Sequence, residues 1–126
     1  MIREKLRRCG GIAFVPLQRG SKFKVKLVDG GVDVSNLGNQ PFLPWVVFQE
    51  AIYVLIRNNG IAQRGNAMDS RLGEEGLLLN SIEGHVANVV YGKKIGDSVF
   101  RRITPIACIL EWAGICHSEP GRLILN

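Results

Sequence analysis

Apolar and polar residues alternate strictly along residues 22–27, with lysine at every polar position. Because side chains alternate between the two faces of a β-strand, this pattern predicts a strand with one buried face and one lysine-rich face. Asp29-Gly30 comes next and favours a two-residue hairpin turn, after which residues 32–34 form the returning strand. A short apolar run at residues 12–17 precedes them. The sequence therefore predicts an N-terminal antiparallel β-meander.

Further along the chain the period lengthens to that of amphipathic helices. Between Trp45 and Asn58 the polar residues recur about every four positions, which predicts a core helix with a narrow polar stripe. Gly60 fits the left-handed residue that ends many helices. Residues 61–79 have the composition of a loop. A second helix is predicted over residues 80–91, where Asn80 and a glutamate three residues later fit a capping box.

The last third of the chain predicts another helix and a hairpin. Residues 99–103 can start a helix, and Pro105 either kinks it or begins a second helix that runs to Ala113. Ser118–Gly121 is a strong turn signal between two apolar segments, which predicts a terminal β-hairpin. The expected fold class is α+β, in a single domain spanning residues 1–126: a basic β-meander over residues 1–40, then a three-to-four-helix, winged-helix-like unit with a C-terminal β-hairpin over residues 45–126.

Composition narrows the setting in which this domain works. A chain of 126 residues with 46% hydrophobic residues can build one core. No apolar run is long enough to span a bilayer, and the charged N-terminus lacks the apolar stretch of a signal peptide. Three cysteines, far apart and without a CxxC pair, suggest neither a disulfide framework nor a metal site. We therefore expect a cytoplasmic protein with reduced thiols and no cofactor.

Positive charge is concentrated at the N-terminus. Residues 1–28 hold eight basic side chains and one acidic side chain, whereas the remaining residues have a net charge of −2. Such asymmetry suggests a polyanionic partner, although lysines on an exposed strand also serve solubility alone. Lys22, Lys24 and Lys26 are candidate phosphate contacts, because a two-stranded ribbon can enter a DNA groove. No aromatic residue is expected on their face, so stacking on single-stranded bases is not predicted.

The segment Val99-Phe100-Arg101-Arg102, a helix ending in Ala113-Gly114-Ile115 and a Pro-Gly turn before an apolar strand together resemble the N-terminal winged-helix domain of Mrr-type restriction enzymes. The resemblance covers roughly residues 45–126. It departs from that family because Pro105 interrupts the recognition helix and no nuclease domain is present. The chain also looks like uncharacterised small bacterial proteins carried on mobile gene cassettes.

The resemblance implies binding of duplex DNA, with phosphate contacts from Arg101 and Arg102 at the helix start, from Arg122 on the wing, and from Lys93 and Lys94 before the helix. The alternative is that the two helix-start arginines are solvated and pair with an aspartate nearby. The helix is also unusually apolar, which suggests burial or a homodimer contact.

Enzymatic activity is not expected. The sequence holds no nucleotide-binding glycine loop and no hydrolase or zinc-protease motif. His85 is predicted to be an exposed helix residue, and Cys108 a core or interface residue. The sequence thus predicts a non-enzymatic DNA-binding module of winged-helix type. The alternative is a homodimeric protein-interaction or small-ligand-binding module, with a surface around Trp45, Phe100 and Trp112.

Overall fold

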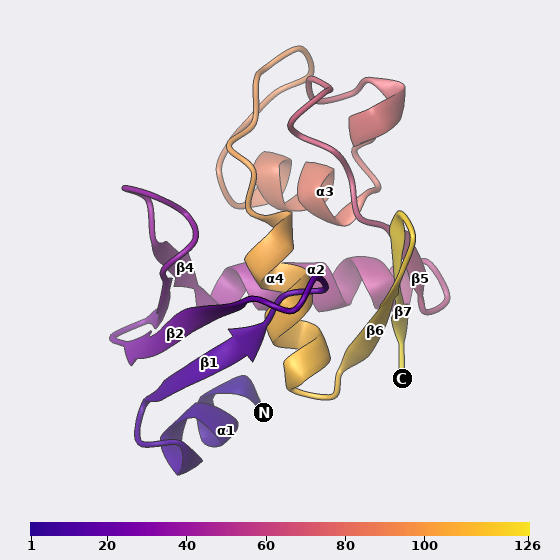
Figure 1. The fold of residues 1–126 in the computed structure, drawn as a ribbon. Coiled ribbons are helices and arrows are strands. Elements are labelled where there is room, and N and C mark those ends of the chain that lie inside the picture. Colours follow the sequence, from indigo (N-terminus) through magenta and orange to yellow (C-terminus); the bar gives the residue numbers. More distant parts are fainter.

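The structure, a computed structural model, describes all of residues 1–126 and confirms the α+β class. It contains two antiparallel sheets and four α-helices (Figure 1). The N-terminal sheet has the order β1-β2-β3-β4, with β1 Ile12–Pro16, β2 Lys22–Val28, β3 Gly31–Val34 and β4 Phe42–Pro44. The C-terminal sheet has the order β5-β7-β6, with β5 Ile61–Gln63, β6 Cys116–Glu119 and β7 Arg122–Leu125. The helices are α1 Ile2–Arg8, α2 Trp45–Arg57, α3 Ile82–Val89 and α4 Ile103–Trp112, with one 3-10 turn, η1 Glu75–Leu77.

The predicted N-terminal hairpin is confirmed. Strand β2 pairs with β3 in the register Leu27 opposite Val32 and Val28 opposite Gly31, which places Asp29-Gly30 in the connecting turn. Gly30 supplies the positive φ of this turn, at 79°. The alternation along β2 is also confirmed, because its apolar residues Phe23 and Val25 are buried while its lysines are exposed.

Helix α4 lies at the centre of the molecule. Figure 1 shows it crossing α2, with the N-terminal sheet on one side and the C-terminal hairpin on the other. Its residues Ile103 and Pro105–Leu110 are all buried, and only Glu111 is exposed. A helix that is apolar on every side must be enclosed by other elements. One cluster of 26 buried residues accordingly draws on both sheets and on α1, α2, α3 and α4.

Pro105 does not break this helix. Of the two predicted alternatives, a helix that starts at residues 99–103 and kinks at Pro105 is wrong, because residues 99–102 are irregular and α4 begins only at Ile103. The other, a helix that begins near Pro105 and runs to Ala113, is close to the observed bounds. Pro105 therefore lies in the first turn, where backbone N–H groups have no partner within the helix. The missing N–H of proline costs no helical hydrogen bond at that position, and α4 runs on to Trp112.

Other boundaries also differ from the sequence predictions. Helix α1 and the short strands β4 and β5 were not predicted. Helix α3 is capped by Ser81 rather than Asn80: the Ser81 hydroxyl accepts a hydrogen bond from the Gly84 N–H at 3.1 Å. None of the helices is long and apolar enough to cross a membrane.

The three cysteines are free thiols in different environments. Cys9 is exposed, whereas Cys108 and Cys116 are buried. Burial raises the pKa of Cys116 to about 11 and also raises that of Cys108, which suppresses the reactive thiolate.

We expect a thiol reagent to modify Cys9 quickly in the folded protein and the two buried cysteines only after unfolding. Counting modified thiols by mass spectrometry, with and without denaturant, checks this. Rapid modification of Cys116 in the native protein would contradict the packing of β6 against α4.

Candidate nucleic-acid interface

The N-terminal sheet has one face packed on the core and one face exposed. Strand register decides which side chains share the exposed face: Phe14 on β1 is paired with Lys24 on β2. In the next row Asp33 on β3 pairs with both Lys26 and Phe42. Residues opposite each other in a sheet point to the same side. We call this surface the open face; it comprises Ile12, Phe14, Pro16, Lys22, Lys24, Lys26, Asp33 and Phe42.

Two aromatic side chains lie on the open face, so the prediction that the lysine face holds none is wrong. Phe14 is 61% exposed and Phe42 is 43% exposed. The alternation along β2 concerns the side chains of that strand alone, whereas these rings come from β1 and β4. Residues 12–17 form an apolar run without alternation, so their sequence does not say which side Phe14 occupies. Pairing with the alternating strand β2 would have supplied that information.

The lysines of the open face have no acidic partner. None of Lys22, Lys24 and Lys26 is within ion-pair distance of a carboxylate, although Lys26 is opposite Asp33 in the sheet. The Lys24 backbone N–H donates to the Ser35 hydroxyl at 2.8 Å, which ties the end of β3 to β2. Three ammonium groups and one carboxylate on the open face leave it positively charged.

Much of the remaining N-terminal charge is already engaged. The Lys5 ammonium donates to the backbone carbonyl of Trp112 at the end of α4 and lies over that indole ring. Arg7 pairs with Glu4 on α1 at 3.3 Å, and the Arg3 guanidinium lies over the Trp45 ring. Lys5 and Arg3 thus hold α1 against the rest of the protein, whereas the Arg7–Glu4 pair lies within α1. The β2 lysines remain as the free cations of a regular surface.

Arg102, predicted as a phosphate contact, is buried. Its guanidinium lies 3.7 Å from the centre of the Tyr91 ring and 4.8 Å from that of Phe100, and its Nη2 donates to the Gln40 side chain at 3.1 Å. A planar guanidinium held between two rings is stabilised by cation–π interactions. In this conformation its side chain supports the start of α4 and does not reach a phosphate outside the protein.

The other predicted phosphate contacts are scattered. Arg122 pairs with Glu119 across the hairpin turn at 2.7 Å. Arg101 is exposed and contacts the Met68 sulfur, with no ion pair to Asp97. Lys93 and Lys94 lie in the α3–α4 loop, where the Lys94 backbone N–H donates to the Asp97 carboxylate.

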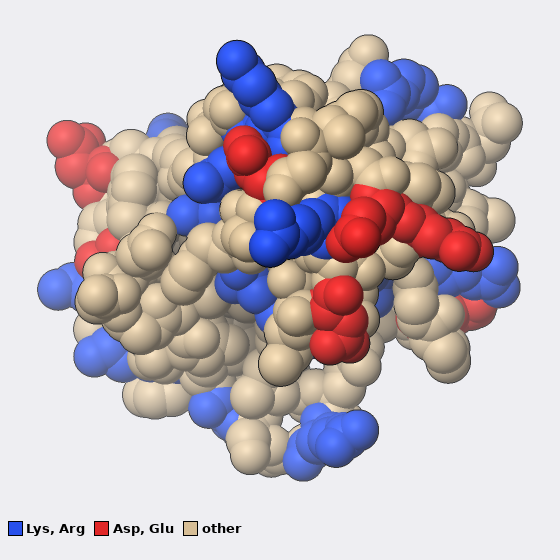
Figure 2. Space-filling view, turned by 90° about the horizontal axis from the view of Figure 1, so that it is seen from above, with Lys and Arg blue, Asp and Glu red and all other residues tan.

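Figure 2, which views the α3 end of the molecule, shows acidic and basic side chains interspersed. The structure therefore gathers only the three β2 lysines on one regular surface.

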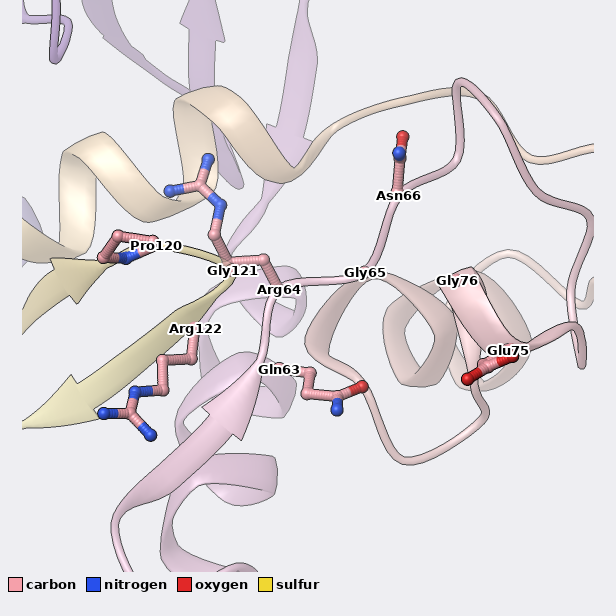
Figure 3. Close-up of a pocket in the computed structure, with 9 residues that line it drawn as sticks. All are labelled: Gln63, Arg64, Gly65, Asn66, Glu75, Gly76, Pro120, Gly121 and Arg122. Atoms are coloured by element: carbon pink, nitrogen blue, oxygen red, sulfur yellow. The ribbon is translucent and has the colours of Figure 1, made fainter.

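A polar cleft of about 480 Å³ lies between the hairpin turn and the segment after β5 (Figure 3). Arg64 and Arg122 border it, but their side chains extend to opposite sides of the turn. Arg64 is half-buried, and burial lowers the pKa of its guanidinium. The side chains that line the cleft do not converge on one point, and none of them is a histidine, cysteine or serine.

Glu83, in the first turn of α3, has a buried carboxylate that lies beside the start of α4. Its Oε1 accepts the Arg102 backbone N–H at 2.8 Å, and it is only 2% exposed. Burial raises the pKa of Glu83 to about 7, although this hydrogen bond and the nearby Arg102 charge lower it in part. Three side-chain atoms around it have no hydrogen-bond partner: Glu83 Oε2, Arg102 Nε and the Tyr91 hydroxyl.

His85 is not the exposed residue that the sequence predicted. It is 7% exposed, and its Nε2 lies 2.8 Å from Oε1 of Glu50 on α2. The side chain thus joins α3 to α2 beside the Tyr53 ring. No group of three or more histidine, cysteine or acidic side chains is placed to hold a metal ion.

Comparison of the chain with protein-family models, with curated proteins and with solved structures finds no match. The surfaces of the protein itself are therefore the basis for its proposed function. Among the surfaces described above, the open face combines charge, exposure and regular spacing.

Glu83 gives the protein a pH-dependent stability. Its pKa is about 7 in the folded state against an ordinary value of 4.5, so the folded protein keeps a proton that the unfolded chain loses between these two values. The free energy of unfolding should therefore fall as pH rises from 4.5 to 7, by on the order of 3 kcal/mol. In Glu83→Gln, which retains an acceptor for the Arg102 N–H, this fall should disappear.

Urea unfolding at several pH values measures the effect. Glu75→Gln, a change at an exposed glutamate, is the control and should keep the wild-type pH dependence. Identical pH profiles for wild type and Glu83→Gln would show that Glu83 does not titrate in this range.

Proposed function

We propose that this protein is a non-enzymatic nucleic-acid-binding module that contacts the phosphate backbone through the open face of its N-terminal sheet. The observation that carries the proposal is the row of Lys22, Lys24 and Lys26, exposed on one strand and without an acidic partner. Alternate residues of a strand are roughly 7 Å apart. Such a row follows a chain of phosphates and releases the counterions bound to them.

The burial of α4 directs the proposal to the sheet. The resemblance to winged-helix domains implies that this helix would enter the major groove of DNA. In this protein α4 exposes only Glu111 fully, and a carboxylate repels phosphate. A helix enclosed by the core has no free face for a groove. The positively charged surface on β2 is available instead.

A second candidate function is the binding of a small apolar ligand. A groove of about 670 Å³ runs between α1 and α2, and apolar side chains, including Trp45, Phe48 and Ile52, make up most of its lining. The Trp45 indole Nε1 is buried there without a hydrogen-bond partner. Grooves of this size and composition hold small ligands in other proteins. A shift of tryptophan fluorescence on adding an apolar dye, lost in Ile52→Glu, would favour this function.

Replacing Lys22, Lys24 and Lys26 together with glutamine tests the main proposal. Each phosphate contact contributes about 0.9 to the slope of log affinity against log salt for duplex DNA and about 0.7 for single strands. The triple variant should therefore lose affinity at low salt and show a slope smaller by about 2 for single strands and by about 3 for duplex DNA. Fluorescence anisotropy of labelled oligonucleotides over a range of salt concentrations measures both quantities.

The matched control is a second triple variant, which removes three positive charges outside the open face: Lys93→Gln, Lys94→Gln and Arg101→Gln. These residues lie around the α3–α4 loop and the start of α4, where the winged-helix interpretation places phosphate contacts. We expect this control to keep the wild-type slope. A reduced slope in the control alone would place the phosphate contacts there, and a lack of salt-dependent binding by the wild type would refute the proposal.

A further inference from the structure

We infer that the open face binds an unpaired strand of nucleic acid, with Phe14 and Phe42 stacking on bases and the β2 lysines holding the phosphates between them. The inference rests on the proposed function and specifies its ligand. It depends on an observation separate from the charge: the two aromatic rings that the sheet register places on either side of the lysines.

The exposure of these rings distinguishes them from the other phenylalanines. Of the five in the chain, Phe23 and Phe48 are buried in the core, and Phe100 is partly buried against the Arg102 guanidinium. Phe14 and Phe42 are the two exposed ones. Both lie on the same face of the same sheet, so this face concentrates the exposed phenyl rings of the protein.

The arrangement of the rows suits an extended strand. Phe42, Asp33 and Lys26 occupy one row across the sheet, and Phe14 lies in the next row, beside Lys24. Spacings of about 4.8 Å between strands and 3.4 Å per residue put the two phenylalanine positions roughly 16 Å apart. Two non-adjacent bases can therefore each meet a ring, while the phosphates linking them pass over the lysines.

Stacking requires bases whose faces are free. In a duplex each base is covered by its neighbours, so Phe14 and Phe42 would meet only sugar and phosphate. An unpaired strand can turn its bases onto aromatic rings, which is how sheet surfaces recognise single strands. Asp33 repels phosphate near Phe42 and can accept a hydrogen bond from a base amino group, which favours a base rather than a phosphate at that position.

Charge argues against a second copy of this chain as the occupant. A symmetric pairing of two open faces would bring the same patch of each copy together. Three unpaired lysines of one copy would then face three of the other, and like charges across an interface disfavour association. A polyanion with flat apolar groups is complementary to both the lysines and the rings.

The test compares three labelled probes of equal length: oligothymidine, oligouridine and a duplex DNA. We expect at least one single strand to bind more tightly than the duplex.

Phe14→Ala should weaken single-strand binding by about tenfold or more, with an unchanged salt slope and unchanged duplex binding. Phe14→Leu should resemble Phe14→Ala, whereas Phe14→Trp should retain affinity, because stacking needs an aromatic ring. Phe42→Ala should show the same pattern.

Ile56→Ala is the control, since Ile56 is 63% exposed on α2 and should leave binding unchanged. Equal affinity for duplex and single strand, with no effect of Phe14→Ala, would overturn the inference while the lysine effect on salt dependence still supported the proposed function. Loss of all salt-dependent binding would refute both. A dimer in sedimentation that Phe14→Ala dissociates would also overturn the inference, because the open face would then be covered by a second copy.

Discussion

The burial of α4 is the constraint on which the rest of the structure depends. Seven of its residues, Ile103 and Pro105–Leu110, are buried, so other elements have to surround the helix. Its N-terminus then lies inside the protein, where backbone N–H groups need acceptors. The Glu83 carboxylate accepts one of them at Arg102, and Tyr91 and Phe100 enclose the guanidinium of that residue. A buried helix needs hydrogen-bond partners for the backbone groups at its terminus, which explains why an acid and an arginine lie in the core at the start of α4.

This constraint also decides where a partner can bind. The two sheets and α2 enclose α4. Each of these elements packs its apolar face against α4. Only outward surfaces remain for recognition. The α3–α4 loop offers charges of both signs, since the Lys94 backbone N–H holds the Asp97 carboxylate in the same loop as Lys93 and Lys94. The hairpin has its arginine, Arg122, paired with Glu119. The outer face of the N-terminal sheet is the regular surface on which cations remain unpaired.

Sequence patterns were sufficient where a local signal determines the structure. The alternation along β2, the Asp29-Gly30 turn, the period of α2 and the terminal hairpin are each specified by a few neighbouring residues, and all are present. Strands β4 and β5, of three residues each, have no such signal, because pairing with distant partners defines them. The burial of His85 likewise follows from α2 packing on α3, which the sequence around His85 does not reveal.

In the candidate site, too, some features follow from a local sequence signal and others only from pairing with a distant strand. The lysines of β2 could be predicted, since alternation alone puts them on one face. The position of Phe14 could not, because β1 is apolar on both sides and only its register with Lys24 orients the ring. The two kinds of side chain act over different distances: charge attracts a polyanion from afar and weakens with salt, whereas a ring acts only on a base in contact with it. A sheet face that combined lysines with ordinary polar residues would attract any phosphate chain equally. Under the proposed function, the exposed rings on either side of the lysines would provide the short-range discrimination that charge lacks.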